Sequence, residues 1–211
     1  MGRSCAILRV WQRRLFFARP RWVEGRSMPF VPMKTSVSIV ASLLFAFSSL
    51  GWAAESVITV PNAGFEQKGE GWKADQDNGM STFVPEAAHT GKLGLRVTDA
   101  SATLGSNLMS PRFPATAGKS YEVRFYGRNV KGQGIAVYLK FYDAAGKLLN
   151  TPELKNQVNV AIRRTDTEWK QFSVAGVAPA TATQVEIWVH SFIKNEVTAD
   201  FDDFVLVQRD S

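Results

Sequence analysis

The chain has 211 residues, of which 45% are hydrophobic, and a formal net charge of +6. The first 54 residues hold eight Lys and Arg and one acid, so the remaining 157 hold 17 basic and 18 acidic side chains, a net charge near −1. This balance does not support nucleic-acid binding. Cys5 is the single cysteine, which excludes disulfides, cysteine nucleophiles and thiolate metal sites from residue 55 onward.

The segment from Met33 has the pattern of a secretory signal peptide. Met33 and Lys34 form a short basic start, and residues 37–50 are apolar apart from serines. Small residues then permit cleavage after Ala53, or alternatively after Ala54. The apolar run is shorter than the roughly 20 residues that span a bilayer. We therefore predict a signal peptide over residues 33–53, a secreted or periplasmic protein, and no membrane span.

Residues 1–32 precede this signal and carry seven arginines and the single acid Glu24, without a helical or strand period. We interpret them as a mis-assigned start, or as a disordered extension if they are translated. An arginine-rich targeting segment is the alternative. Residues 54–211 are then one domain standing alone, long enough to bury a core without disulfides.

From Ser56 onward, apolar residues alternate with polar ones, and Gly, Pro, Asn and Asp interrupt the pattern. No stretch has a helical period for more than a turn or two. Residues 132–134 are predicted to form a hairpin turn. The fold class is therefore all-β, a two-sheet antiparallel sandwich. The expected strands are 57–60, 81–84, 93–98, 106–110, 120–129, 134–142, 158–163, 169–175, 184–192 and 199–207.

Three of these strands, 120–129, 134–142 and 184–192, have one apolar face and one face that mixes aromatic, charged and amide side chains. We expect the three strands to share one sheet. Rings that stack on a pyranose, beside polar groups that bond its hydroxyls, are typical of sugar binding. A solvated face with cross-strand pairs is the alternative. The candidate ligand-binding residues are Trp188, Tyr126, Tyr138, Tyr142, Arg124, Arg128, Lys140, Gln184, Glu186 and His190.

Six short segments occur in the order of one known family. They are Pro61 to Glu66, Gly71-Trp72, Thr90 to Val97, Ala117 to Tyr126, Thr167 to Phe172 and Thr198 to Leu206. Over residues 57–207 the chain resembles the carbohydrate-binding modules of families 4, 9 and 22, galactose-binding-like jelly rolls attached to cellulases and xylanases. The resemblance implies that a glycan binds on the concave face of one sheet.

The same resemblance implies a structural calcium ion. Its ligands would be the carboxylates of Glu66 and Asp202, with the carbonyls of Asn62 and Lys92 as further candidates. Calcium takes about 6 to 8 oxygen ligands without strict geometry, which suits such a mixed set. Whether Asp203 also binds the metal stays open, because adjacent strand residues point to opposite faces.

A catalytic role would need two carboxylates facing one glycosidic bond. Glu122 and Glu186 are candidates because we expect them on the same face. Their cationic neighbours favour charge pairing over a general acid. His89 and His190 lie in no nucleophile motif. We therefore predict no enzyme, with a glycoside hydrolase or polysaccharide lyase less favoured, and a monomer that binds oligo- or polysaccharide; the alternative is a structural or adhesive sandwich whose partner is another exported protein.

Overall fold

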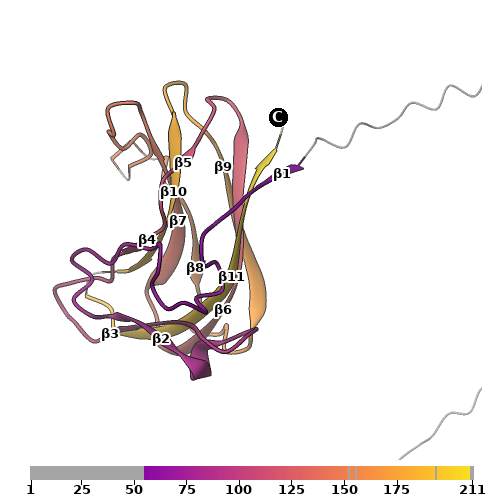
Figure 1. Ribbon diagram of the computed structural model, residues 1–211. Helices are drawn as coiled ribbons and strands as arrows, with labels where there is room; N and C mark the ends of the chain where they lie inside the picture. Colours follow the sequence, from indigo (N-terminus) through magenta and orange to yellow (C-terminus); the bar gives the residue numbers. More distant parts are fainter. Residues whose placement is uncertain (1–54, 152, 155, 193, 210–211) are drawn as a thin grey trace, which may run out of the picture. The chain divides into compact units, whose positions relative to one another are not determined.

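The computed structural model describes residues 55–209 except 152, 155 and 193, and the signal peptide and N-terminal extension predicted above lie outside these residues. The described residues form eleven strands and one short 3₁₀ helix, and the all-β class is confirmed (Figure 1). The elements are β1 (Glu55–Ile58), β2 (Ser81–Val84), η1 (Pro85–Ala87), β3 (Gly94–Asp99), β4 (Leu108–Met109), β5 (Phe113–Pro114), β6 (Ser120–Gly132), β7 (Ile135–Tyr142), β8 (Val158–Ile162), β9 (Lys170–Val177), β10 (Gln184–Ser191) and β11 (Val197–Arg209).

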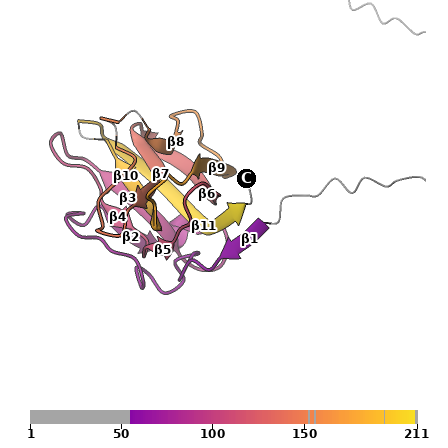
Figure 2. The same ribbon diagram turned by 90° about the horizontal axis from the view of Figure 1, so that it is seen from above.

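The strands pair into two antiparallel sheets. Sheet A has the order β2-β3-β11-β6-β9, and β1 pairs with the end of β11. Sheet B has the order β4-β10-β7-β8, and β5 also pairs with β10. Figures 1 and 2 show the two layers of this sandwich. The predicted two-sheet architecture is confirmed.

The core lies between the sheets and contains the apolar faces predicted for β6, β7 and β10. At one end, Phe65 is fully buried, with its ring centroid 5.1 Å from that of Trp72 and 5.8 Å from that of Phe204. The backbone N–H of Phe204 donates to the carbonyl of Ala63 at 3.0 Å. Large buried rings contribute strongly to core stability. This aromatic cluster therefore joins the opening segment of the domain to its closing strand.

The prediction of a hairpin at residues 132–134 is wrong. β6 and β7 lie in different sheets, so this segment carries the chain from sheet A to sheet B. Gly132 and Gly134 have φ of 78° and 99°, a region that glycine adopts without strain. The N–H of Gln133 donates to the carbonyl of Glu196 at 3.2 Å. A Cβ at Gly132 would lie 2.0 Å from that carbonyl oxygen, so a side chain here would displace backbone.

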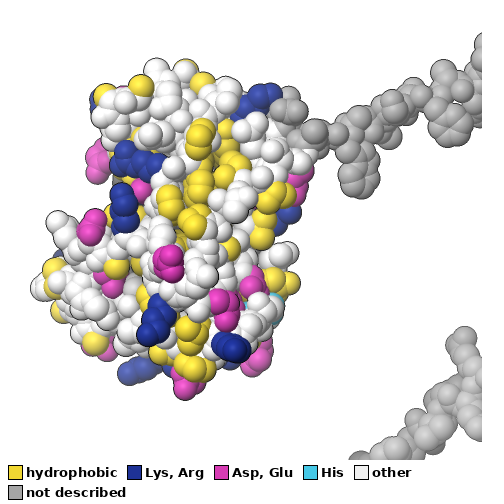
Figure 3. All heavy atoms as spheres, in the orientation of Figure 1, with side chains coloured by type: hydrophobic (Ala, Val, Ile, Leu, Met, Phe, Trp, Pro, Cys, Tyr) yellow, Lys and Arg dark blue, Asp and Glu magenta, His cyan; other side chains and the backbone are white. Residues whose placement is uncertain are grey.

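Charged side chains of both signs share the face of the molecule shown in Figure 3. This mixture agrees with the nearly balanced charge of the chain from residue 55 onward. Within residues 55–209, no helix has the length and hydrophobicity needed to cross a membrane.

Candidate functional site

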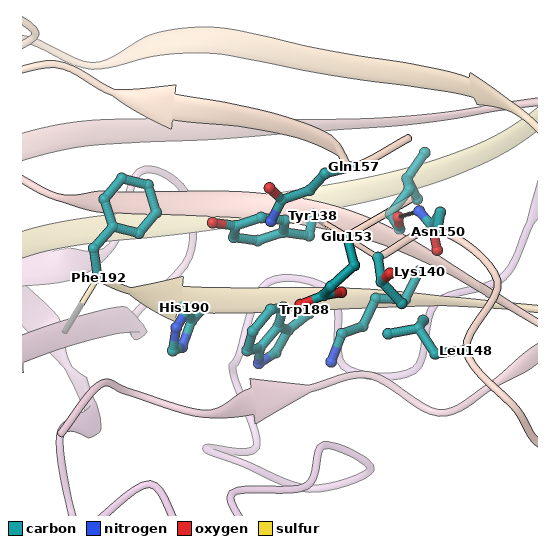
Figure 4. Close-up of a pocket in the computed structure, with 11 residues that line it drawn as sticks. Tyr138, Lys140, Leu148, Asn150, Glu153, Gln157, Trp188, His190 and Phe192 are labelled. Atoms are coloured by element: carbon teal, nitrogen blue, oxygen red, sulfur yellow. Dashed lines mark hydrogen bonds between the residues drawn. The ribbon is translucent and has the colours of Figure 1, made fainter. Parts of the chain in front are cut away.

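A groove of about 490 Å³ lies on the outer face of sheet B (Figure 4). Its floor comes from β7 and β10, and its wall comes from the segment between β7 and β8. A second hollow of about 470 Å³ begins at His190 and is lined by the loop residues Gln76, Asn78 and 103–107. The groove is lined by Tyr138, Leu139, Lys140, Leu148, Asn150, Thr151, Glu153, Gln157, Trp188, His190 and Phe192.

The pleat of β7 and β10 places four of the predicted residues on the floor. Trp188 pairs with Tyr138 in the ladder. Lys140 and His190 lie on the same outer face, each two residues further along its own strand. Phe192, just beyond β10, closes one end of the groove (Figure 4). Sequence reasoning missed Phe192, although it is the last residue of the predicted strand 184–192 and falls on the same face as Trp188 and His190.

The wall is a loop that the alternating pattern did not predict. Asn150 is buried, and its Oδ1 accepts a hydrogen bond from the backbone N–H of Phe141 at 2.7 Å while its Nδ2 donates to the carbonyl of Leu139. Asn156 donates to the carbonyl of Leu149 at 2.9 Å. The two bonds of Asn150 fasten the loop to β7, and the bond of Asn156 lies within the loop. As a result Tyr138 is only 5% exposed, and burial raises its pKa to about 12.

Trp188 stands on edge instead of lying flat on the sheet. The His190 ring stacks against it, with centroids 4.1 Å apart and planes 17° apart. On the other side, Lys140 Nζ lies 3.6 Å from the centroid of the indole ring (Figure 4). Trp188 Nε1 donates to Asn107 Oδ1 at 2.7 Å. Both faces of the indole are therefore covered within the protein, and its edge faces the groove.

Three further predicted residues lie beside the groove and do not line it. Glu186 is 4% exposed, and its Oε2 accepts a hydrogen bond from the hydroxyl of Tyr142 at 2.5 Å. The guanidinium of Arg112 covers the ring of Tyr142 at 3.6 Å from the centroid, and its Nε lies 3.6 Å from Glu186 Oε1. Arg112 also donates to Gln184 Oε1 at 3.4 Å. Burial and the Glu186 carboxylate both raise the pKa of Tyr142.

His190 provides a pH test of this geometry. Its Nδ1 lies 2.5 Å from the carbonyl of Ser106, so it is the N–H donor there. Burial lowers the pKa of His190 below its ordinary value of 6.5. As the pH falls, His190 of the unfolded chain is therefore protonated before His190 of the folded chain. The contribution of this residue to folding stability is complete above pH 6.5 and decreases as the pH drops toward the folded pKa.

In an NMR titration, the ring signals of His190 should show a midpoint below 6.5. A midpoint above 6.5 would contradict the buried, neutral ring.

The structure contradicts the prediction that all ten candidates share one face, because three of them lie on sheet A. Arg124 pairs there with Glu55 and Glu122 at 2.8 and 3.0 Å. Arg128 lies against Trp169 and pairs with Asp200 at 2.9 Å. The ring of Tyr126 stacks on His89, with centroids 3.8 Å apart. The physical reason is the crossing at residues 132–134, which moves β7 to the other sheet. Arg124, Arg128 and Tyr126 are therefore not part of the groove.

A family model described as "Carbohydrate binding domain" matches residues 59–195. The chain belongs to this family. The resemblance inferred from the six segments is thereby confirmed. The groove, with its aromatic and amide lining, is thus a feature of a carbohydrate-binding module.

Solved structures agree on the fold. The CBM22-1 xylan-binding domain of Paenibacillus barcinonensis Xyn10C has a TM-score of 0.54 and 18% identity over 76% of this chain and 99% of that one. Family 16 Carbohydrate Binding Module-2 has a TM-score of 0.52 and 18% identity over 70% and 97%. An arabinose-bound α-L-arabinofuranosidase, MgGH51, has a TM-score of 0.51 and 15% identity, over 71% of this chain and 26% of the enzyme. No match was found among curated proteins.

The candidate catalytic pair is separated in this module. Glu122 lies on β6 in sheet A, whereas Glu186 lies on β10 in sheet B, so the expectation of a shared face is wrong. Glu122 is bound by Arg124 and by Arg209 at 2.7 Å. These two carboxylates cannot act together on one glycosidic bond, because the sheets and the core stand between them.

The carboxylates proposed for calcium lie near one loop, residues 89–93. Glu66 Oε1 accepts hydrogen bonds from the backbone N–H groups of Lys92 and Leu93 at 2.8 and 3.1 Å. These two bonds lower the pKa of Glu66. Asp202 is fully buried, and its Oδ2 accepts from the N–H groups of His89 and Thr90 at 2.8 and 3.0 Å. Burial raises the pKa of Asp202.

The side chains of the neighbouring residues Asp203 and Asn62 already have hydrogen-bond partners within the protein. Asp203 occupies a β-bulge with φ of 54°, and its carboxylate meets the ring of His89 and the hydroxyl of Thr90, each at 2.7 Å. The amide of Asn62 donates to the carbonyls of Lys68 and Glu70. Among the described residues, no group of three or more His, Cys, Asp and Glu side chains is arranged to hold a metal. A cation here would depend on backbone carbonyls.

Proposed function

We propose that this module is an exported, non-catalytic protein that binds an oligo- or polysaccharide in the groove on sheet B. The supporting observation is the lining of the groove, where the aromatic side chains of Tyr138, Trp188 and Phe192 lie beside the amide of Gln157. Apolar ring surfaces contact the C–H faces of a pyranose, and amides exchange hydrogen bonds with its hydroxyls. The family to which the chain belongs supports the same ligand class.

The second hollow beyond His190 extends the surface available to a sugar chain. Its lining includes the amides of Gln76 and Asn78 beside Leu104. Because His190 borders both hollows, a glycan of two or more sugar units could contact the aromatic floor and these amides together. This supports an oligo- or polysaccharide over a monosaccharide.

Native affinity electrophoresis through gels that contain neutral or acidic polysaccharides tests this function. We expect at least one polysaccharide class to retard the protein, because an immobile ligand slows a binding protein in proportion to its affinity. A monomeric, folded protein of similar charge and size that lacks the groove provides the mobility reference. Unchanged mobility in every gel, from a protein with native circular dichroism, would refute glycan binding and favour a protein partner.

We also propose that a structural calcium ion is held by Glu66 and Asp202, with carbonyl oxygens, including those of Asn62 and Lys92, as further ligands. The supporting observation is the small residue beside them: a Cβ at Gly64 would come into ordinary contact, at 3.5 Å, with the Oδ1 atoms of both Asp202 and Asp203, so glycine places no side chain against these two oxygens. A bound cation would supply a positive charge beside the buried carboxylate of Asp202 and would join the opening segment of the domain to β11.

Calcium is expected to raise the thermal unfolding midpoint by about 5 °C or more over chelator, because a ligand of the folded state alone stabilises by mass action. Differential scanning calorimetry with calcium, with magnesium and with chelator measures this. The Glu66→Gln variant should lose the response, whereas Glu70→Gln, an exposed acid of the same loop, should keep it. Equal midpoints with calcium and chelator would contradict the site.

A further inference from the structure

The ammonium group of Lys140 lies in the groove without a carboxylate partner. Among the described residues, no Asp or Glu oxygen lies within 4.0 Å of Lys140 Nζ, and its close contact is the indole of Trp188. Burial lowers the pKa of this ammonium, although the nearby Glu186 opposes the shift. The groove therefore contains a partly desolvated cation whose direct partner is an aromatic face.

The nearest acid is committed to other partners. Glu186 is opposite Lys140 in the β7–β10 ladder, yet its Oε2 accepts from Tyr142 and its Oε1 faces Arg112. The buried carboxylate beside Lys140 is thus taken up by Arg112 and Tyr142. Among the described residues that line the groove, the one acid is Glu153, which is exposed and reaches over the Trp188 side of the groove (Figure 4).

We propose that the groove selects glycans that carry carboxylate groups, and that Lys140 is the residue that determines this specificity. The inference rests on the proposed function and names the ligand class of the same groove. A sugar that stacks on the indole face of Trp188 covered by Lys140 must move Lys140 Nζ off the ring. A uronate supplies a new partner for the displaced ammonium, whereas a neutral sugar supplies none.

The alternative is that Lys140 merely packs on Trp188. In that case its removal would change the affinities for acidic and neutral glycans equally. The ratio of the affinities for acidic and neutral glycans therefore distinguishes the two roles, because a general loss of packing leaves that ratio unchanged.

Isothermal titration calorimetry with paired polysaccharides measures this ratio. Each of polygalacturonate, alginate and glucuronoxylan is compared with its own carboxyl-reduced form, which keeps the chain and loses the charge. We expect an acidic form to bind about tenfold or more tightly than its reduced partner, as is usual for a hydrogen bond to a charged group. The Lys140→Gln variant should abolish this preference, so that it binds the acidic and the reduced form with equal affinity.

Two further variants complete the design. Lys131→Gln removes the same charge from an exposed position on β6 of sheet A, and should keep the preference. Glu153→Gln should strengthen binding of the acidic form, because it removes a like charge from the rim. Equal affinities for acidic and reduced forms in the wild type, or an unchanged preference in Lys140→Gln, would overturn the inference while leaving glycan binding intact. No binding to any form would refute the proposed function itself.

Discussion

Replacing Trp188 with alanine is expected to weaken glycan binding by about 30-fold or more, the size of effect typical of a central aromatic contact. The indole forms the middle of the groove floor, between His190 and Lys140 and opposite Tyr138. Its loss removes the apolar edge that a sugar ring would meet and leaves Asn107 without the donor at Nε1. Titration calorimetry with the polysaccharide that retards the wild type gives the two affinities.

Trp169 provides a matched control. It is also half-buried, and it also contacts a histidine ring and a cationic side chain, His89 and Arg128, but it lies on the sheet A side of the domain. Trp169→Ala should therefore leave glycan affinity within about twofold, since distant sites seldom interact. Equal losses for the two variants would show that the groove is not the binding surface.

Replacing Asp202 with alanine is expected to lower the free energy of unfolding by about 3 kcal/mol or more. The fully buried carboxylate accepts hydrogen bonds from three backbone N–H groups, those of His89, Thr90 and Asp203. Each buried donor left without an acceptor costs about 1 to 3 kcal/mol. The bulge at Asp203, with its positive φ, would lose the bond that holds it.

Urea unfolding followed by tryptophan fluorescence, in chelator so that metal does not contribute, measures this loss. Asp202→Asn keeps an acceptor oxygen and should lose less than Asp202→Ala. Asp75→Ala, at an exposed position, should be within about 0.5 kcal/mol of the wild type. A loss below about 1 kcal/mol for Asp202→Ala would contradict the view that this carboxylate organises the loop at residues 89–93.

Alternation in the sequence predicted the faces of individual strands well. Val123, Val137 and Val185 are all fully buried, as the period of two required. Sheet membership was harder, because alternation says which face a residue occupies and not which sheet its strand joins. The glycines at 132 and 134 are compatible with either a hairpin or a crossing, so Tyr126 was wrongly placed beside Tyr138.

The groove itself depends on features that no local pattern contains. Its wall is held by the two hydrogen bonds of Asn150, an amide in an irregular loop. The position of the Trp188 ring depends on His190 and Lys140, which lie on two different strands. The candidate residues chosen from the alternating pattern therefore included Tyr142, whose ring is covered by Arg112, and omitted Phe192. The family resemblance identified the fold and the ligand class but not these contacts.

The most direct test of the central claim is the NMR signal of the Trp188 indole N–H, assigned by its absence in Trp188→Phe. During titration with a glycan that retards the protein, this signal should move, because the groove floor includes the indole and its bond to Asn107. The signals of Trp72, in the core, and Trp169, on the sheet A side, should stay in place. Movement of the Trp169 signal with a fixed Trp188 signal would contradict a binding site on sheet B.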